Sequence, residues 1–377
     1  MTDYRIPFNR PFFIGNELKY IEAAVRGGVT AGDGPFTRQC QALMEQRFGA
    51  RKILLTHSCT AALEMSALLA DIRPGDEVVL PSYTFVSTAN AFHLRGARLR
   101  FIDIRGDNLN MDEELLPDLL TAQTRAIVPV HYAGAGCNMD VIMDVAANHK
   151  LVVIEDAAQA VDATYGDRYL GTIGHMGTYS FHETKNVISG EGGALVINDE
   201  QFIHRAEIIR EKGTNRSSFF RGEVDKYTWV DVGSSYLPSD MIAAFLLAQL
   251  EQIDVITRRR REIFSYYAST LAELEDAGLL VLSRDHAGSN GHMFFVLARS
   301  NDERQGLINF LKGRGILSVF HYVPLHLSPI GQQMGYRQGD LPVTEALSDR
   351  LLRLPFYFEM TRDEQDQVVA GITDYFS

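Results

Sequence analysis

An acidic pair and a lysine each follow a short apolar run, and they are the residues of this sequence whose types suggest chemistry. Glu155 and Asp156 come directly after the run 151–154 (LVVI), and Lys185 follows the run 177–181 (GTYSF). Consecutive apolar positions of this kind are typical of parallel strands buried on both faces. Because ligands collect at the carboxyl ends of strands in open α/β sheets, we expect the acid and the lysine to face a shared crevice.

A lysine and an acid in one crevice are what pyridoxal phosphate (PLP) requires. The lysine forms a Schiff base with this cofactor, and the acid keeps the pyridine nitrogen protonated so that the ring acts as an electron sink. Each residue alone also fits an ordinary role, Asp156 as a helix cap and Lys185 as a solvated surface residue. Their joint placement, before the glycine-rich stretch 190–193 (GEGG), favours the cofactor site.

A third candidate feature is the stretch Ser58-Cys59-Thr60, which follows an apolar run and opens the helical pattern 61–70 (AALEMSALLA). Small hydroxyl residues at a helix start cap free backbone N–H groups, and the same groups bind phosphate. From the residues alone both roles stay open. A PLP site needs one such anion cradle, which favours the phosphate role.

Strand and helix patterns alternate along the first two thirds of the chain. This rhythm predicts βαβ units and a mostly parallel sheet. Gly134-Ala135-Gly136 resembles the start of a dinucleotide motif, but Met139 occupies its third glycine position, which disfavours that site. Strands are expected at 52–55, 77–80, 98–102, 126–130, 151–154, 177–181 and 194–197, and helices at 37–48, 86–95, 112–122, 139–149 and 201–210.

The two ends of the chain suggest a second, smaller unit. Residues 1–30 resemble an extended arm followed by a short helix, and such an arm can pack away from its sequence neighbours. A long helical stretch, 239–274, is a plausible connector between domains. We therefore predict a large domain with an N-terminal arm over 1–250 and a small α+β domain over 251–377, the latter with strands at 279–282 and 292–297 and helices at 303–314, 343–352 and 362–375.

A long polar loop, 212–229 (KGTNRSSFFRGEVDKYTW), is locally basic in an acidic protein. Long loops in compact domains are usually functional or disordered. The loop is either a solvated surface segment or a clamp for a phosphorylated substrate, in which Arg216 and Arg221 would bind the phosphates and Tyr227 and Trp229 would offer stacking faces.

Two histidines and a tyrosine lie together at His321, Tyr322 and His326. A helical zinc pair needs spacing i, i+4 without an intervening proline, whereas Pro324 separates these histidines, so we expect no metal site. Substrate contact and plain packing both remain open for the three residues.

Composition excludes several classes of protein. Of the 377 residues, 46% are hydrophobic and 22% charged, which is ordinary for a soluble globular protein. The net charge of -12 disfavours a nucleic-acid-binding surface. Three cysteines without CxxC spacing suggest a reducing compartment, and no signal peptide or membrane-length apolar run is evident. We expect a cytoplasmic enzyme with no nucleic-acid or membrane partner.

Taken together, the motifs resemble the DegT/DnrJ/EryC1/StrS family of PLP-dependent sugar aminotransferases, and the resemblance runs over essentially the whole chain. It implies an α/β fold of the type I, aspartate aminotransferase-like class, with a large doubly wound mixed sheet domain and a small α+β C-terminal domain. Within the family, HETKN, REKGTNRS and DKYTW are most similar to transaminases that form dTDP-4-amino-4,6-dideoxygalactose. The motifs are SCTAALE (58–64), PGDEVVLPSYTFVSTANA (74–91), VHYAG (130–134), IEDAAQA (154–160), YSFHETKN (179–186), GEGG (190–193) and HYVPLH (321–326).

The resemblance assigns a role to each matching residue. Lys185 would carry the cofactor and shuttle the proton, and Asp156 would pair with the pyridine nitrogen. Gln159 would lie near the ring hydroxyl, and Phe85 would stack on the ring. Many relatives bind the phosphate with an asparagine of the partner subunit, where this chain has Ser235. The remaining phosphate ligands implied are Cys59, Thr60 and Ser180.

The implied reaction is ping-pong transamination in a homodimer whose two subunits share the active sites. L-glutamate would donate its amino group, and C4 of a dTDP-4-keto-6-deoxyhexose would accept it, giving 2-oxoglutarate and a dTDP-4-amino-4,6-dideoxyhexose of galacto configuration. Transfer to C3 of the sugar and a non-catalytic nucleotide-sugar sensor are alternatives. Lys185 disfavours a related dehydratase, which has histidine at that position, and the intact pair with Asp156 disfavours the sensor.

Overall fold

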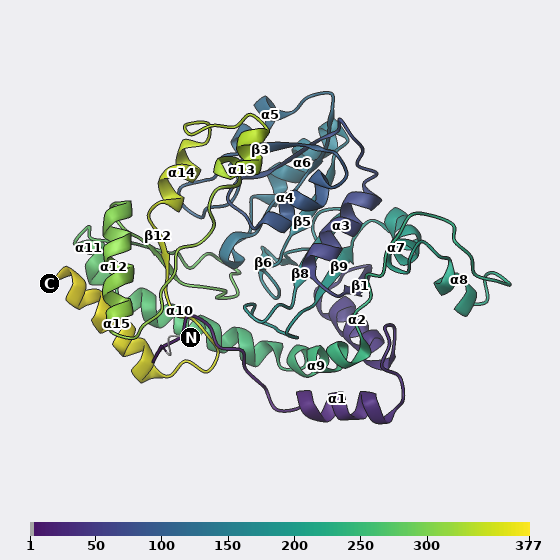
Figure 1. The fold of residues 1–377 in the computed structure, drawn as a ribbon, viewed down its shortest axis with the longest axis horizontal. Coiled ribbons are helices and arrows are strands. Elements are labelled where there is room, and N and C mark those ends of the chain that lie inside the picture. The colour runs from purple at the N-terminus through teal and green to yellow at the C-terminus, as the bar shows by residue number, and fades with distance from the viewer. Residues whose placement is uncertain (1–3) are drawn as a thin grey trace.

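A seven-stranded mixed sheet forms the centre of the computed structural model, which describes residues 4–377 (Figure 1). Its strand order is β1-β9-β8-β5-β4-β2-β3. Strands β3, β2, β4, β5 and β8 pair in parallel, whereas β9 runs antiparallel to both β8 and β1. The predicted βαβ units are therefore confirmed. The strands are β1 (Lys52–Thr56), β2 (Glu77–Pro81), β3 (Arg98–Ile102), β4 (Thr124–Ile127), β5 (Val152–Asp156), β8 (Met176–Ser180) and β9 (Gly193–Ile197).

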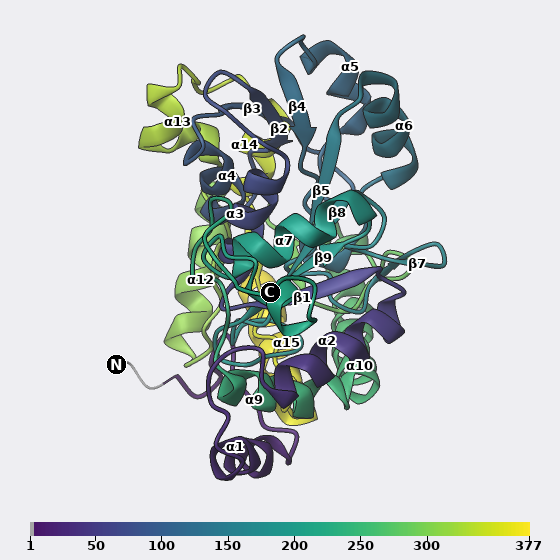
Figure 2. The same cartoon turned by 90° about the vertical axis from the view of Figure 1, so that its right-hand side faces the viewer.

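Helices cover both faces of this sheet, which is why its strands are apolar at consecutive positions. Successive side chains of a strand point to opposite faces, so Val153 packs in one hydrophobic cluster and Ile154 in the other. Figure 2 shows α3 and α4 on one side of the sheet and α6 on the other. The first face is covered by α2 (Pro35–Phe48), α6 (Met139–His149) and α9 (Asp240–Leu250), and the second by α3 (Cys59–Leu69), α4 (Val86–His93) and α7 (Ile203–Arg210).

A three-stranded antiparallel sheet, β10-β11-β12, organises the C-terminal part of the chain. Its core also takes in Ile6 of the N-terminal arm, which pairs with Ile316 through a backbone bridge. The arm thus packs far from its sequence neighbours, as expected. The strands are β10 (Val281–Leu282), β11 (Phe295–Leu297) and β12 (Leu351–Arg353), and the helices around them are α10 (Ile253–Thr270), α12 (Asn301–Gly313) and α15 (Arg362–Phe376).

Shorter elements complete the structure. Helix α1 packs against α9 and lies at the lower edge of Figure 1, and α8 projects from the right-hand side of the same view. Among the described residues, no helix is both long enough and apolar enough to span a membrane. The remaining elements are α1 (Glu17–Arg26), α5 (Leu116–Leu119), α8 (Arg216–Phe220), α11 (Ala272–Asp276), α13 (Pro329–Gln333), α14 (Pro342–Ser348), the hairpin β6 (Thr164–Tyr165) and β7 (Arg168–Tyr169), and the 3₁₀ helices η1 (Glu113–Leu115), η2 (Tyr132–Gly134), η3 (Glu200–Phe202) and η4 (Leu325–Leu327).

Three predicted helices are wrong in extent. The stretch 239–274 is divided into α9, α10 and α11, because Gln252 has φ −114° and ψ 16° and interrupts the helix after Leu250. The stretch 112–122 forms only η1 and α5, and 343–352 is helical only to Ser348, because its last two residues pair with β11 as part of β12. The predicted domain division at 250/251 falls in the break between α9 and α10 and stays a prediction.

Candidate active site

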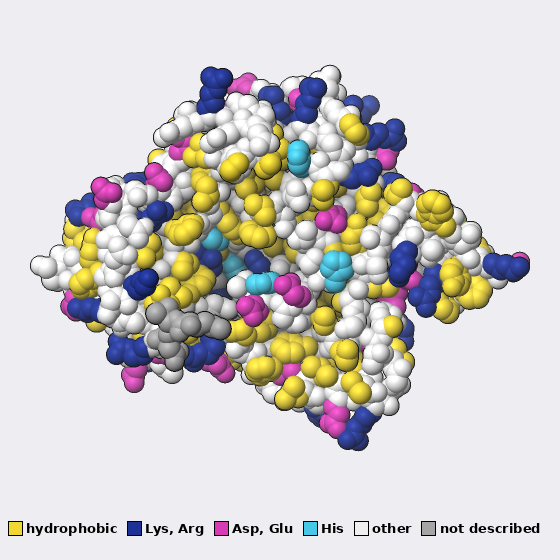
Figure 3. Space-filling model, in the orientation of Figure 1, with side chains coloured by type: hydrophobic (Ala, Val, Ile, Leu, Met, Phe, Trp, Pro, Cys, Tyr) yellow, Lys and Arg dark blue, Asp and Glu magenta, His cyan; other side chains and the backbone are white. Residues whose placement is uncertain are grey.

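The carboxyl ends of β5 and β8 place the candidate acid and lysine at one edge of the sheet. The two strands pair in parallel, with Asp156 opposite Thr178, and the loop that carries Lys185 leaves the end of β8. Both side chains line a single cavity of about 480 Å³, as the strand pattern predicts. Figure 3 shows a hollow near the middle of the molecule, and histidine and basic side chains are visible in it.

Lys185 has the environment of a lysine that works as a neutral amine. Burial lowers the pKa of its ammonium group, the positive charge of Arg353 lowers it further, and the negative charge of Asp156 opposes both. No residue of 4–377 accepts a hydrogen bond or ion pair from its Nζ atom. The amine is therefore free to react or to take up a proton inside the cavity.

The carboxylate of Asp156 is held in place by two donors. The backbone N–H of Ala158 donates to Oδ1 (3.1 Å) and the Thr88 hydroxyl to Oδ2 (2.7 Å), while Thr84 Oγ1 lies 2.9 Å from that of Thr88. Asp156 thus enters the cavity with a fixed orientation and with capacity for a further donor, such as a protonated ring nitrogen.

The first turn of α3 provides an anion cradle beside these groups. The Ser58 side chain accepts from the N–H of Ala61 (3.1 Å), which leaves the N–H groups of Cys59 and Thr60 without acceptors among residues 4–377. Gly193 allows this helix start to lie directly on the sheet, because a Cβ atom there would come within 2.4 Å of the Cys59 nitrogen. Capping and anion binding, which the sequence left as alternatives, therefore fall to different residues: Ser58 caps, and the next two N–H groups are free.

Aromatic and amide side chains form a further part of the cavity wall. Gln159 donates from Nε2 to the Tyr322 hydroxyl (2.9 Å) and accepts from the N–H of Ala133 (2.6 Å). His321 stacks on Tyr322, with ring centroids 3.7 Å apart. Phe85, which is 56% exposed, also lines the cavity, so a flat ring bound there would have an aromatic face available.

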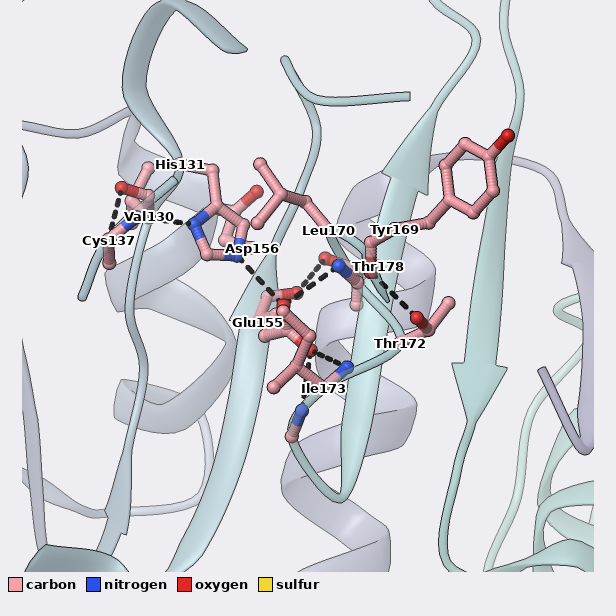
Figure 4. Close-up of polar contacts among 12 residues, drawn as sticks. Val130, His131, Cys137, Glu155, Asp156, Tyr169, Leu170, Thr172, Ile173 and Thr178 are labelled. Atoms are coloured by element: carbon pink, nitrogen blue, oxygen red, sulfur yellow. Dashed lines mark hydrogen bonds and ion pairs between the residues drawn. The ribbon is translucent and has the colours of Figure 1, made fainter. Parts of the chain in front are cut away.

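Glu155, the other member of the acidic pair, does not line the cavity, and its carboxylate instead binds backbone N–H groups of the following loop (Figure 4). Its Oε1 accepts from the N–H groups of Ile173 (2.7 Å) and Gly174 (2.6 Å), and its Oε2 from that of Gly171 (2.8 Å). Nε2 of the buried His131 lies 2.9 Å from Oε2. Glu155 therefore fixes the loop between β5 and β8 and, through it, the relative position of the two strand ends.

Two candidate residues lie outside the cavity. The buried His326 has Nδ1 2.7 Å from Ser82 Oγ and Nε2 3.0 Å from Glu345 Oε1, so both ring nitrogens are engaged. This is the packing role, and it leaves no polar group of His326 free for a substrate. Ser235 is exposed, and its backbone pairs with Glu211 through an isolated bridge.

The predicted basic loop 212–229 also lies outside the cavity of its own chain. It is ordered around α8, and its arginines are paired: Arg216 with Glu211 (3.4 Å), and Arg221 with Glu207 (2.9 Å) and with Glu223. Tyr227 and Trp229 are 53% and 78% exposed. The segment therefore projects with exposed aromatic side chains, and its two arginines are already paired with glutamates.

Several cavity residues escaped the sequence reasoning. Ser87, whose hydroxyl lies 2.8 Å from that of Thr60, and Thr88 belong to a hydroxyl-rich stretch after β2 that could have been recognised. His182 lies inside the FHETKN motif. His292 and Arg353 come from distant parts of the chain and carry no local signal.

A larger and more open groove, of about 820 Å³, lies elsewhere and offers no comparable chemistry. Its most buried basic residue, Arg47, is already paired with Asp162 (2.8 Å) and Asp254 (2.5 Å). We interpret this groove as a surface ion-pair network.

The residues of the smaller cavity fit PLP. A free lysine amine, an oriented carboxylate and unpaired helix N–H groups are the groups needed for its aldehyde, its ring nitrogen and its phosphate. The sheet order and the cavity at the carboxyl ends of its strands define a type I PLP-dependent transferase, which confirms the predicted fold class.

Comparison with known proteins agrees with this class. Residues 13–373 match the DegT/DnrJ/EryC1/StrS aminotransferase family. The chain is 33% identical over 378 residues to the spore coat polysaccharide biosynthesis protein SpsC of Bacillus subtilis, covering 98% of this chain and 96% of that protein. The crystal structure of the aminotransferase TlmJ from Streptoalloteichus hindustanus is similar with a TM-score of 0.90 at 28% identity, covering 98% of both chains. The PLP form of Spr1654 from Streptococcus pneumoniae, assigned as a sugar aminotransferase, gives 0.90 at 25% identity, covering 99% of this chain and 98% of that one.

The chain therefore belongs to the DegT/DnrJ/EryC1/StrS aminotransferase family. It is an aminotransferase that uses pyridoxal phosphate as its cofactor.

Proposed function

We propose that this aminotransferase moves an amino group from L-glutamate to C4 of a dTDP-4-keto-6-deoxyhexose. The products are 2-oxoglutarate and a dTDP-4-amino-4,6-dideoxyhexose of galacto configuration. The main observation in support of transamination is that Lys185 is an amine without a partner among residues 4–377, has a lowered pKa and lies in the same cavity as Asp156. The sugar and the position of transfer are supported by the motifs HETKN, REKGTNRS and DKYTW.

Each cavity residue has a defined part in this reaction. Lys185 would hold the cofactor between turnovers and, as a free amine, would move a proton to and from the substrate carbon. Asp156 would hold the proton of the ring nitrogen, with Thr88 and Ala158 fixing its carboxylate. The N–H groups of Cys59 and Thr60, with the nearby Ser180, would bind the phosphate. When bound, PLP supplies the electron sink that stabilises the substrate carbanion.

The proposal includes a homodimer in which each site is completed by the partner. Support comes from the large apolar side chains left exposed on one chain, including Phe13 (61%), Leu18 (73%) and Trp229 (78%), and from α8, which projects from the rest of the chain (Figure 1) and does not line its own cavity. In such a dimer Ser235 would approach the partner's phosphate, and the segment with Arg216, Arg221, Tyr227 and Trp229 would reach the partner's nucleotide. Exposed apolar surface of this kind is typical of subunit interfaces.

The same proposal gives the enzyme a cytoplasmic role in polysaccharide biosynthesis. SpsC of Bacillus subtilis, which matches nearly the whole chain, is a spore coat polysaccharide biosynthesis protein. An aminated nucleotide sugar is a suitable activated precursor for such a polymer, since the nucleotide is the leaving group in glycosyl transfer.

Absorption spectroscopy of the PLP-loaded enzyme tests the proposal directly. L-glutamate should convert the visible cofactor band to that of the aminated cofactor, and dTDP-4-keto-6-deoxyglucose should restore it. NMR of the isolated sugar then assigns the aminated carbon and its configuration. Amination at C3, or recovery of the band with other keto acids but with no keto-sugar, would contradict the proposed substrate.

A further inference from the structure

His292 is a buried histidine whose two ring nitrogens have different surroundings. It lies shortly before β11 and lines the cavity that contains Lys185. Its Nδ1 is 2.8 Å from Oδ1 of Asn186, the residue that follows Lys185 in the sequence. Its Nε2 has no hydrogen bond or ion pair with any of residues 4–377, and the surrounding atoms do not seal it off. One ring nitrogen is therefore bound to the protein, and the other is available in the cavity.

The hydrogen bonds of Asn186 assign the proton of this ring. The side-chain Nδ2 of Asn186 donates to the backbone oxygen of Asn290 (3.0 Å), an atom that can only accept. The amide oxygen of Asn186 therefore faces His292, and since that oxygen has no proton, Nδ1 of the histidine must be the donor. A neutral imidazole with its proton on Nδ1 has a lone pair on Nε2. His292 thus presents a hydrogen-bond acceptor to the cavity.

The surroundings of His292 keep its ring neutral and its backbone fixed. Burial lowers its pKa well below the ordinary value of 6.5, and the positive charges of Lys185, Arg260 and Arg353 lower it further, as does His321. Arg260 also donates from Nη2 to the backbone oxygen of His292 (2.6 Å). The lone pair on Nε2 is therefore present at neutral and at mildly acidic pH.

Lys185 is the donor that complements this lone pair. Its Nζ has no acceptor among residues 4–377, and its charge acts on the ring of His292. The two side chains are not hydrogen-bonded to each other in the structure, but the flexible four-carbon stem of a lysine lets its amine move within the cavity. Because Asn186 directly follows Lys185, the loop that carries the amine also orients the acceptor.

We propose that His292 positions Lys185 for proton transfer by accepting a hydrogen bond at Nε2 when the amine is released from the cofactor. The amine takes a proton from the substrate carbon, the electron pair left on that carbon passes to the cofactor, and the proton is later returned. His292 itself forms and breaks no covalent bond. An ammonium group formed at a buried site needs an acceptor, since burial disfavours its charge. The inference rests on the proposed role of Lys185 and adds the residue that orients it.

Two substitutions separate the two ends of the ring. His292→Asn keeps an amide N–H near the position of Nδ1 and removes the acceptor at Nε2, whereas His292→Gln places an amide oxygen near the position of Nε2. In rapid-mixing absorption measurements, His292→Asn should slow the glutamate half-reaction at saturation about 10–100-fold, the effect expected of one hydrogen bond to a charged group, with little change in KM. His292→Gln should recover most of this rate. His175→Asn, at a partly buried histidine outside the cavity, is the matched control and should react like wild type.

Titration of the cofactor-free enzyme gives a readout that does not depend on turnover. A hydrogen bond to Nε2 stabilises the ammonium form of Lys185, so its loss should lower the pH at which half of the amine is neutral. The rate of PLP capture, measured against pH, reports this midpoint. The midpoint should be lower in His292→Asn than in wild type, and His292→Gln and His175→Asn should keep the wild-type midpoint.

Equal half-reaction rates and equal midpoints in wild type and His292→Asn would overturn the proposal. A slower half-reaction with an unchanged midpoint would also overturn it and would assign His292 to packing. If His292→Asn does not fold, nitrogen-15 NMR of histidine-labelled wild type decides. At about pH 6 the signal missing from His292→Gln should be that of a neutral ring protonated at Nδ1, and protonation at Nε2 would overturn the proposal. If L-glutamate does not convert the PLP form of wild type, the proposed transamination fails, while the midpoint of His292→Asn still tests the hydrogen bond.

Discussion

Asp156 and Glu155 are consecutive acids at the end of β5 with opposite tasks. Side chains alternate along a strand, so Asp156 enters the cavity, where Thr88 and Ala158 orient it, and Glu155 turns to the other face. The carboxylate of Asp156 is thus available to a bound ring, whereas the carboxylate of Glu155 already accepts hydrogen bonds from backbone N–H groups. Exchanging the two tasks would require a shift of register by one residue.

At this scale we predict that Asp156→Asn slows proton transfer without unfolding the protein. The amide keeps an acceptor for Thr88 or Ala158, but it has no negative charge to hold the proton of the ring nitrogen. Single-turnover absorption measurements should show both half-reactions slowed by about 10²–10⁴-fold. Thr88→Ser, which keeps the hydroxyl donor, should react at close to the wild-type rate. An unchanged rate in Asp156→Asn would show that the ring proton is held by another group.

The site residues that could be predicted from the sequence are those whose position follows from a local pattern of strands and helices. Asp156, Lys185, Cys59 and Thr60 follow strands or open a helix, and the sequence shows both features. Arg353 could not be predicted, because its place in the cavity depends on how β12 pairs with β11, and its segment carries a helical pattern. His326 has the right residue type but is buried, and burial cannot be read from a motif.

Between elements, buried carboxylates tie segments that are distant in sequence. Asp240 at the start of α9 accepts from the N–H and hydroxyl of Thr37 in α2, and Asp103 after β3 accepts from the same groups of Thr344 in α14. Each supplies the cap that its partner helix lacks in its own sequence. Such contacts between distant segments leave no local pattern in the sequence. The strands could therefore be predicted from the sequence, but their order in the sheet could not.

Glu155 is a further buried carboxylate of this kind and accepts from three backbone N–H groups, so Glu155→Ala should destabilise the protein by about 3–5 kcal/mol. The substitution leaves the N–H groups of Gly171, Ile173 and Gly174 buried without an acceptor. Urea unfolding followed by circular dichroism should show a lower midpoint with an unchanged slope. Glu200→Ala, at an exposed glutamate, is the control and should unfold like wild type. Equal midpoints for the two variants would show that the loop after β5 is held by other contacts.

Across the whole molecule, the cavity brings basic and acidic side chains together in a chain whose net charge is -12, and Asp156 and Glu191 line it as well as two basic residues. Lys185 and Arg353 line it, and Arg260 lies buried beside it. Burial lowers the pKa of His292 well below its ordinary value of 6.5, the neighbouring basic groups lower it further, and the pKa of His321 is lowered in the same way.

The lowered pKa of His292 predicts a loss of stability on acidification. Below about pH 6.5 the unfolded chain binds a proton at this histidine and the folded chain does not, so the free energy of unfolding falls as pH falls. The contribution is at most about 1.4 kcal/mol per pH unit for one group. Urea unfolding between about pH 7.5 and pH 5 should show a smaller pH dependence in His292→Gln than in wild type. His149→Gln, at an exposed histidine, should keep the wild-type dependence, and the same dependence in both variants would contradict the assignment.

The claim on which the account depends is that Lys185 carries the cofactor. Borohydride reduction of the PLP-loaded enzyme, followed by peptide mass mapping, measures this directly because it fixes the cofactor to the amine that holds it. We predict a single pyridoxyl group on the peptide that contains Lys185, and none in a folded Lys185→Ala variant. Attachment to a different lysine, or no attachment after saturation with PLP, would contradict the account.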